Sequence, residues 1–191
     1  MAHWYQVTAD EELRQGEILL GVPVYEPLIY AGIPAPNSEQ PAEARVLDLI
    51  IVTPSCDLVE RAVPGKPKPS VVFCEHWDLR NQVSSGKLTA NKVPEIEKGR
   101  LPLNYILPAS PFQEVTMGLR IVDFGRIYSL PRAIAFAHAA ACGSRLRLLP
   151  PFCEHFAQAF ARCYMRIGLE VTAWEYSHGD KGAETPPKEI K

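Results

Sequence analysis

The stretch VLDLIIVT, residues 46–53, is the strongest strand pattern in the chain. All but two of its side chains are apolar, which predicts a β-strand buried on both faces of a sheet. It is followed by Pro54 and then by Ser-Cys-Asp-Leu at 55–58. Because a strand holds the loop after it in a defined place, this strand end is a natural position for reactive side chains.

Shorter strand patterns surround this stretch. Eighteen prolines and twelve glycines divide the chain into short segments, which favours strands over long helices in its first two thirds. The further predicted strands cover residues 16–25, 70–74, 105–107, 115–122 and 127–129.

One long helix is predicted over residues 151–168, where apolar side chains recur at helical spacing and Gly168 suits the C-terminal cap. With the strands, it indicates an α+β fold. We expect a strongly bent, mainly antiparallel small β-barrel with this C-terminal amphipathic helix packed on it. A single globular domain is expected over residues 1–178, followed by a disordered polar tail over 179–191.

The composition indicates a globular protein. The chain is 47% hydrophobic and 22% charged, which argues against intrinsic disorder, a collagen-like fibre and a coiled coil. No apolar run approaches the roughly 18 residues of a membrane-spanning helix, so no membrane association is expected. The N-terminal residues show no secretory signal, and the five cysteines are an odd number. We therefore expect a cytoplasmic protein with reduced thiols and no cofactor.

Charge is distributed unevenly along the sequence. Residues 1–60 hold two basic and ten acidic side chains, whereas residues 61–178 hold fifteen basic and nine acidic ones. One interpretation is an anion-binding surface, with RNA as the ligand. Residues 83–104 form a basic stretch that is predicted to be an exposed loop. Its Lys87 and Lys92 would then hold the RNA electrostatically. The other interpretation is that the acidic and basic parts pair within the fold.

Cys56 and Asp57 lie just beyond the end of the strongest strand. Cys56 would be a nucleophile if a neighbouring cation or histidine stabilised its thiolate. Alternatively, it is a small packed residue and Asp57 caps the turn that follows.

Two Cys-Glu-His tripeptides raise the question of a metal site. Cys74 and His76 are two apart on a strand and point the same way, whereas Cys153 and His155 are two apart on a helix and diverge. Zinc sites need convergent ligands, so the spacing does not predict a metal centre.

The polar side of the predicted helix carries Arg162 and Arg166. These side chains either line a cleft or a partner surface, or form a solvated face with local ion pairs.

The order of elements resembles the MazF/PemK family of toxin endoribonucleases over about residues 14–135. The resemblance lies in Gly16-Glu17-Ile18 opening the first strand, in a second strand from Arg45 to Pro54, and in a third from Val71 to His76. It implies a compact barrel-like sheet and metal-independent RNA cleavage.

The resemblance also implies roles for single residues. In that family an arginine opening the second long strand acts together with a hydroxyl side chain after the next strand. Arg45 matches the arginine and would stabilise the phosphorane. Thr53, later on the same predicted strand, is a further candidate catalytic residue. The hydroxyl position falls within 74–76, where this chain has no hydroxyl, so Glu75 or His76 would act as general base. The implied partners are single-stranded RNA, an antitoxin or other protein partner, and a second copy of the chain.

A second resemblance involves Ser-Cys-Asp-Leu at 55–58 together with the C-terminal stretch that begins at Arg145-Leu146-Arg147-Leu148. This combination is similar to a family of uncharacterised bacterial proteins and implies no activity. Three functions therefore stay open. They are RNA cleavage or binding, a non-catalytic protein-interaction module, and a thiol or metal site at Cys56 and Cys74.

Overall fold

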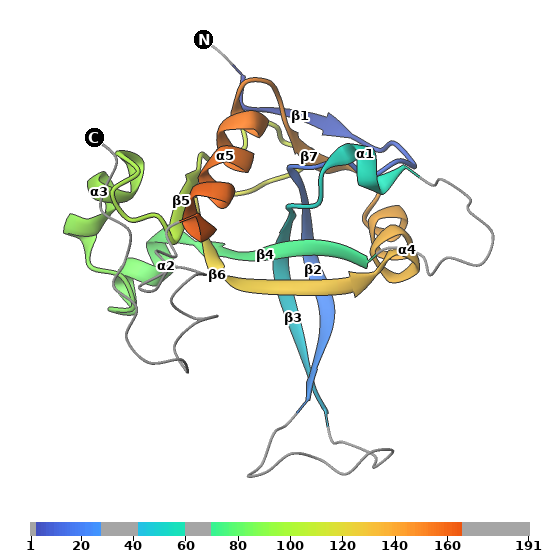
Figure 1. The fold of residues 1–191 in the computed structure, drawn as a ribbon, viewed down its shortest axis with the longest axis horizontal. Helices are drawn as coiled ribbons and strands as arrows, with labels where there is room; N and C mark the ends of the chain where they lie inside the picture. The colour runs from blue at the N-terminus through green and yellow to red at the C-terminus, as the bar shows by residue number, and fades with distance from the viewer. Residues whose placement is uncertain (1–2, 28–41, 60–69, 166–191) are drawn as a thin grey trace, which may run out of the picture.

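The computed structural model describes residues 3–27, 42–59 and 70–165 (Figure 1). Within these residues the fold is α+β, with seven strands in one sheet and five α-helices. The strands are β1 (Tyr5–Thr8), β2 (Glu17–Pro27), β3 (Ala42–Ile51), β4 (Ser70–Asp78), β5 (Asn104–Leu107), β6 (Arg120–Pro131) and β7 (Arg145–Leu148). The helices are α1 (Ser55–Leu58), α2 (Leu79–Ser84), α3 (Val93–Glu97), α4 (Arg132–Cys142) and α5 (Phe152–Tyr164), with a short 3-10 helix at Ala90–Lys92.

The sheet is antiparallel throughout, as the sequence predicts. Its strand order is β1-β7-β2-β3-β4-β6-β5, and every pairing between neighbours is antiparallel. Within the described residues the sheet is not closed, since β1 and β5 stand at opposite ends of this order. The expected barrel is therefore not confirmed.

β3 contains the stretch that dominates the sequence, but only its second half is covered on both sides. Leu49, Ile50 and Ile51 pair with β4 and are fully buried. The first half pairs with β2 alone, and the two strands project from the body as a ribbon (Figure 1). Val46, which was expected to be buried, is 74% exposed because no second layer packs on the ribbon there.

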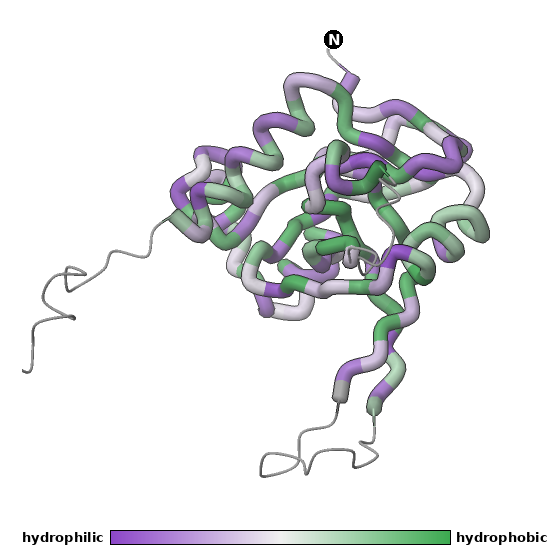
Figure 2. Tube along the Cα trace, turned by 45° about the vertical axis from the view of Figure 1, so that its right-hand side comes forward, coloured by the Kyte–Doolittle hydropathy of each residue, from purple (hydrophilic) through white to green (hydrophobic). Residues whose placement is uncertain are grey.

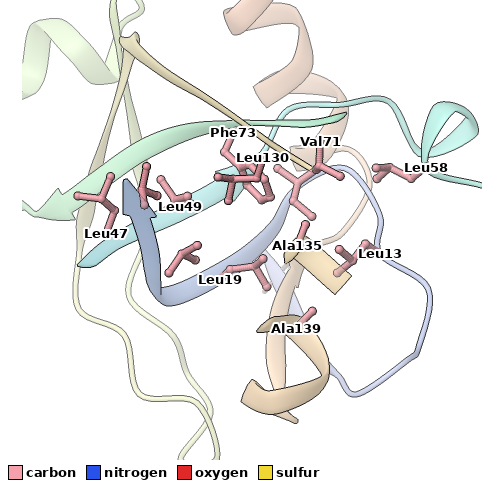
Figure 3. Close-up of a cluster of buried hydrophobic side chains, with 13 residues drawn as sticks. Leu13, Leu19, Leu47, Leu49, Leu58, Val71, Phe73, Leu130, Ala135 and Ala139 are labelled. Carbon is pink, nitrogen blue, oxygen red and sulfur yellow. The ribbon is translucent and has the colours of Figure 1, made fainter. Parts of the chain in front are cut away.

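Two apolar layers lie on opposite faces of the central strands. On one face, Leu49 and Phe73 pack with α4, whose Ala135 and Ala139 complete the cluster in Figure 3. On the other face, Ile50 packs among the residues beneath α5. This alternation follows from the two-residue period of a strand. Figure 2 shows the hydrophobic residues gathered in the strands at the centre of the molecule, whereas the ribbon alternates between hydrophobic and hydrophilic residues.

α5 confirms the predicted amphipathic helix on the sheet. Phe156 is fully buried, and its ring lies 5.7 Å from that of Phe124 on β6 and 5.5 Å from that of Tyr105 on β5. The helix is described as far as Tyr164. The predicted continuation to Gly168 and the predicted tail at 179–191 lie outside the described residues.

The predicted basic loop at 83–104 is instead a small helical lobe. It comprises the end of α2, the 3-10 helix and α3, and it packs through Leu79 and Ile96 against Ile121 of β6. Apolar residues spaced through this polar stretch supply a minor core, although they show no regular period in the sequence. Across the described residues, no helix is both long and apolar enough to span a membrane.

Much of the charge asymmetry is resolved by pairing within the fold. Glu17 is fully buried and accepts hydrogen bonds from Arg145 Nε at 2.9 Å and from Arg147 Nη2 at 2.7 Å. Arg147 also reaches Asp10 at 3.0 Å. We call these four residues the Glu17 cluster. It joins the acidic N-terminal third to the arginine-rich part of the chain, as one of the two interpretations of the charge pattern expected.

Candidate functional site

A second group of charged and aromatic side chains surrounds Glu75 on β4. The Glu75 side chain is 3% exposed. Its Oε1 accepts a hydrogen bond from Trp77 Nε1 at 2.7 Å, and its Oε2 accepts one from the Tyr128 hydroxyl at 3.1 Å. We call the whole group the Glu75 cluster, which consists of Glu26, Arg45, Glu75, Trp77, Arg126 and Tyr128.

Two arginines approach the same buried carboxylate. Arg45 Nη2 lies 4.0 Å from Glu75 Oε1, and Arg126 Nη1 lies 3.7 Å from Oε2. Arg45 Nη1 also donates to both carboxylate oxygens of Glu26, each at 3.0 Å. The arginine side chains stay 34% and 49% exposed. The cluster therefore holds two guanidinium groups at the surface over one buried negative charge.

The strand period explains why these residues meet. On β3 the row of core side chains at Leu49 and Leu47 continues to Arg45 at the next inward position. On β4 the row at Phe73 continues in the same way to Glu75. The cluster therefore lies where the apolar layer packed against α4 ends and polar side chains follow in the same rows. Glu26 on β2 and Tyr128 on β6 occupy the equivalent steps on their own strands.

Arg126 stands beside an irregularity in β6, on the face of the strand that it shares with Tyr128. Cys74 pairs with Ile127 but its neighbour Glu75 pairs with Asp123, so the three residues between them on β6 have no partner on β4. Up to Ile127 the register is regular, and one further step places Arg126 opposite Glu75 although the two do not pair. Arg126 belongs to the unpaired segment and is exposed, yet its guanidinium reaches back to Glu75.

Tyr128 connects the two carboxylates of the cluster. Its hydroxyl lies 2.9 Å from Glu26 Oε1 and 3.1 Å from Glu75 Oε2. Burial, aided by the hydrogen bond to Glu26, raises the pKa of Tyr128 to about 12, so the phenol keeps its proton at neutral pH. A single hydroxyl proton serves one carboxylate at a time. The hydrogen bond from Arg45, with one from Tyr128, lowers the pKa of Glu26, so this carboxylate is ionised.

His76 faces away from the cluster although it follows Glu75 directly. It is 1% exposed and lies on the opposite face of β4, the face on which Cys74 packs beneath α5, because neighbouring residues of a strand point to opposite sides. Burial, together with the charge of Arg120, lowers the pKa of His76 to about 3. Neither ring nitrogen has a hydrogen-bond partner among the described residues. His76 therefore does not join Arg45.

Thr53 is also distant from Arg45. It lies eight residues further along the chain, which corresponds to roughly 26 Å in an extended strand. Its Oγ1 accepts a hydrogen bond from the Val72 amide at 2.7 Å, which ties the end of β3 to β4. Of the four residues proposed as catalytic, the structure brings together Arg45 and Glu75 and separates Thr53 and His76 from them.

Cys56 and Asp57 are exposed in α1, at the end of β3 that is remote from Arg45. The Cys56 thiol donates to Asp57 Oδ1 at 3.6 Å. Its partner is therefore a carboxylate, whereas an activated cysteine needs a cation or a histidine. Ser55 accepts a hydrogen bond from the Gln15 amide, so the Ser-Cys-Asp-Leu segment anchors the chain before β2.

The cysteine and histidine pairs do not form a metal centre in the described residues, where no group of three or more potential ligands converges. Cys74 and His76 are both buried, as their alternation on one face of β4 indicates. Cys153 donates to the Gln15 carbonyl, while His155 is exposed on α5.

The remaining proposed binding residues are spread over the surface. Lys87 and Lys92 are exposed on the helical lobe, and Arg162 is exposed on α5. Arg166 lies outside the described residues. The lobe contacts the cluster through Trp77, which packs against its apolar residues.

Sequence reasoning missed Glu26, Trp77, Arg126 and Tyr128 as members of this site. Arg126 and Tyr128 alternate on one strand, which is a weak signal. The three unpaired residues of β6 include Gly125, and an isolated glycine within a strand is a signal for such an irregularity.

Comparison with models of known protein families and with curated proteins finds no match for this chain.

Proposed function

We propose that the protein binds single-stranded RNA at the Glu75 cluster and cleaves it without a metal ion. The observation that carries the proposal is the pair of surface arginines, Arg45 and Arg126, that converge on one buried carboxylate. Guanidinium groups bind phosphate through planar paired hydrogen bonds, and groups already held in place lose less entropy on binding. The resemblance to the MazF/PemK family, including its barrel-like sheet, belongs to this proposal and points to the same arginine.

The proposed reaction is a transesterification. The ribose 2′-oxygen bonds to the adjacent phosphorus while the bond from phosphorus to the 5′-oxygen of the next nucleotide breaks. The products are a 2′,3′-cyclic phosphate and a 5′-hydroxyl end. A carboxylate takes the 2′-hydroxyl proton, and the leaving oxygen takes a proton from water. Arg45 and Arg126 stabilise the additional negative charge on the phosphorane.

The two carboxylates differ in solvent exposure, and we assign them different roles for that reason. The Glu26 side chain is 36% exposed and can reach a bound ribose, so we assign it as the proton acceptor. Glu75 is 3% exposed and holds both arginines and Tyr128, so its part is to position them. Lys87 and Lys92 on the lobe would add attraction for the flanking phosphates.

The test is cleavage of mixed single-stranded RNA by the purified protein in excess EDTA, with the fragments sequenced. Arg45→Ala and Arg126→Ala should each reduce cleavage by about 100-fold or more, the usual cost of removing a transition-state charge donor. Arg14→Ala is the matched control, because Arg14 is also an exposed arginine beside a glutamate but lies outside both the cluster and the lobe. It should cleave like the wild type.

The outcomes separate the parts of the proposal. Discrete cuts that require Arg45 and Arg126 support it. RNA binding that depends on these arginines, without any cleavage, would rule out the catalytic part of the proposal. Intact RNA and no binding at high protein excess would overturn it entirely.

A second candidate function is a non-catalytic interaction module, which the β2–β3 ribbon favours. Tyr25 and Val46 are 71% and 74% exposed there. They share a face, because Tyr25 pairs with Ala44 and Val46 pairs with Pro23. Exposed apolar patches of this kind often mark protein contacts. Sedimentation of the wild type and of Val46→Glu would show whether this face joins two copies.

A further inference from the structure

Trp77 occupies a defined position beside the arginines. Its indole Nε1–H bonds to Glu75, and its ring packs against the apolar cluster of the lobe formed around Leu79, Ile96 and Ile121. The side chain is nevertheless only partly buried. An aromatic ring held by its polar edge and by packing, with surface still open, is a suitable platform for a flat ligand.

Arg126 stands over this ring without closing on it. Its guanidinium carbon lies 5.6 Å from the centre of the Trp77 ring. Elsewhere in the molecule Arg132 lies 3.8 Å above the Phe136 ring, which is direct stacking contact. The Arg126 side chain is 49% exposed and stays paired with Glu75 at 3.7 Å, so its solvent-facing side is open to a ligand. The cation and the ring thus form a loose pair at the surface.

We propose that the Trp77 ring is a nucleobase subsite, in which an unpaired base stacks on the indole and Arg126 covers its other side. This inference rests on the proposed RNA binding and specifies the form of RNA that is bound. The phosphate attached to this nucleotide would then lie near Arg45, which shares Glu75 with Trp77 and Arg126. A duplex is excluded, since its bases already stack on one another.

The test separates base stacking from phosphate binding. The probes are an octamer of riboadenylate and an eight-unit ribose-phosphate backbone of the same charge that lacks bases. Stacking of one base on an aromatic side chain typically strengthens binding by about 5- to 150-fold. The wild type should therefore prefer the octamer by a factor in this range. Trp77→Leu should bind both probes alike, whereas Trp77→Phe keeps a ring and should retain most of the preference.

A measurement on the unaltered protein guards against a folding defect in Trp77→Leu. An octamer carrying one 2-aminopurine should lose fluorescence when it binds the wild type, because stacking on indole quenches this base. Equal wild-type affinity for the two probes, or binding without quenching, would overturn the subsite and leave the RNA-binding proposal standing. If neither probe binds, the proposed function itself fails.

Discussion

The Glu17 and Glu75 clusters use the same chemistry in different ways. Each contains a buried glutamate flanked by two arginines. Around Glu17, the side chains of Arg145 and Arg147 are only 2% and 8% exposed. Arg145 directs its other nitrogens to backbone carbonyls of the surrounding segments.

In the Glu75 cluster, by contrast, Arg45 and Arg126 remain 34% and 49% exposed. Their distances to the buried carboxylate, 4.0 and 3.7 Å, are longer than the 2.9 and 2.7 Å at Glu17. Removing a partner of a buried, fully bonded charge costs stability, whereas a partly exposed pair contributes little. The Glu17 cluster therefore holds the fold together, whereas the Glu75 cluster presents two cations at the surface.

The largest effect is expected from Glu17→Ala. The variant leaves Arg145 and Arg147 buried without their carboxylate, which should lower the free energy of unfolding by about 3–5 kcal/mol. Urea denaturation followed by circular dichroism measures this loss. A change below about 1 kcal/mol would mean that the Glu17 cluster does not hold β2 to β7.

His76 is buried and, among the described residues, has no hydrogen-bond partner for its ring. It should make the free energy of unfolding depend on pH, with an effect of intermediate size. Its folded-state pKa of about 3 lies well below the ordinary value, so the unfolded chain binds a proton first as the pH falls. The stability that depends on neutral His76 is complete above about pH 6.5 and is lost progressively as the pH falls toward 3. Between pH 7 and pH 5 the loss should be about 2 kcal/mol.

His76→Leu should remove most of this slope, as measured by urea unfolding at the two pH values. Asp10 and Glu26 have lowered pKa values and lose their contributions only at more acidic pH. A wild type whose stability is unchanged from pH 7 to pH 5 would contradict the burial of a neutral His76.

The smallest effect on stability is expected for the surface arginines of the Glu75 cluster. Arg45→Ala and Arg126→Ala should unfold within about 1 kcal/mol of the wild type, because partly exposed ion pairs contribute little. The same variants should lose RNA cleavage. They would thus lose activity without losing stability, whereas Glu17→Ala should lose stability. A destabilisation as large as that of Glu17→Ala would place both clusters in the structural role.

Part of the site was accessible from the sequence. The alternation of a strand already places Glu75 and His76 on opposite faces, so only one of them can share a face with Arg45. The separation of eight residues between Arg45 and Thr53 likewise exceeds the reach of two side chains on one strand. Arg45 and Glu75 do meet, but Glu26, Arg126 and Tyr128 join them only through pairing between β2, β3, β4 and β6.

The sequence by itself determined the elements whose patterns are local and strong. The apolar run at 46–53 predicted the buried half of β3, and the helical spacing of aromatic residues predicted α5, because a continuous apolar run and a 3.6-residue period are both visible within a few turns or residues of the chain. Only the tertiary structure decided which half of β3 is covered, that the sheet is open within the described residues, and that the register of β4 and β6 places Arg126 beside Glu75. These features depend on strand register and on contacts between residues far apart in the chain, for which local periodicity carries no signal.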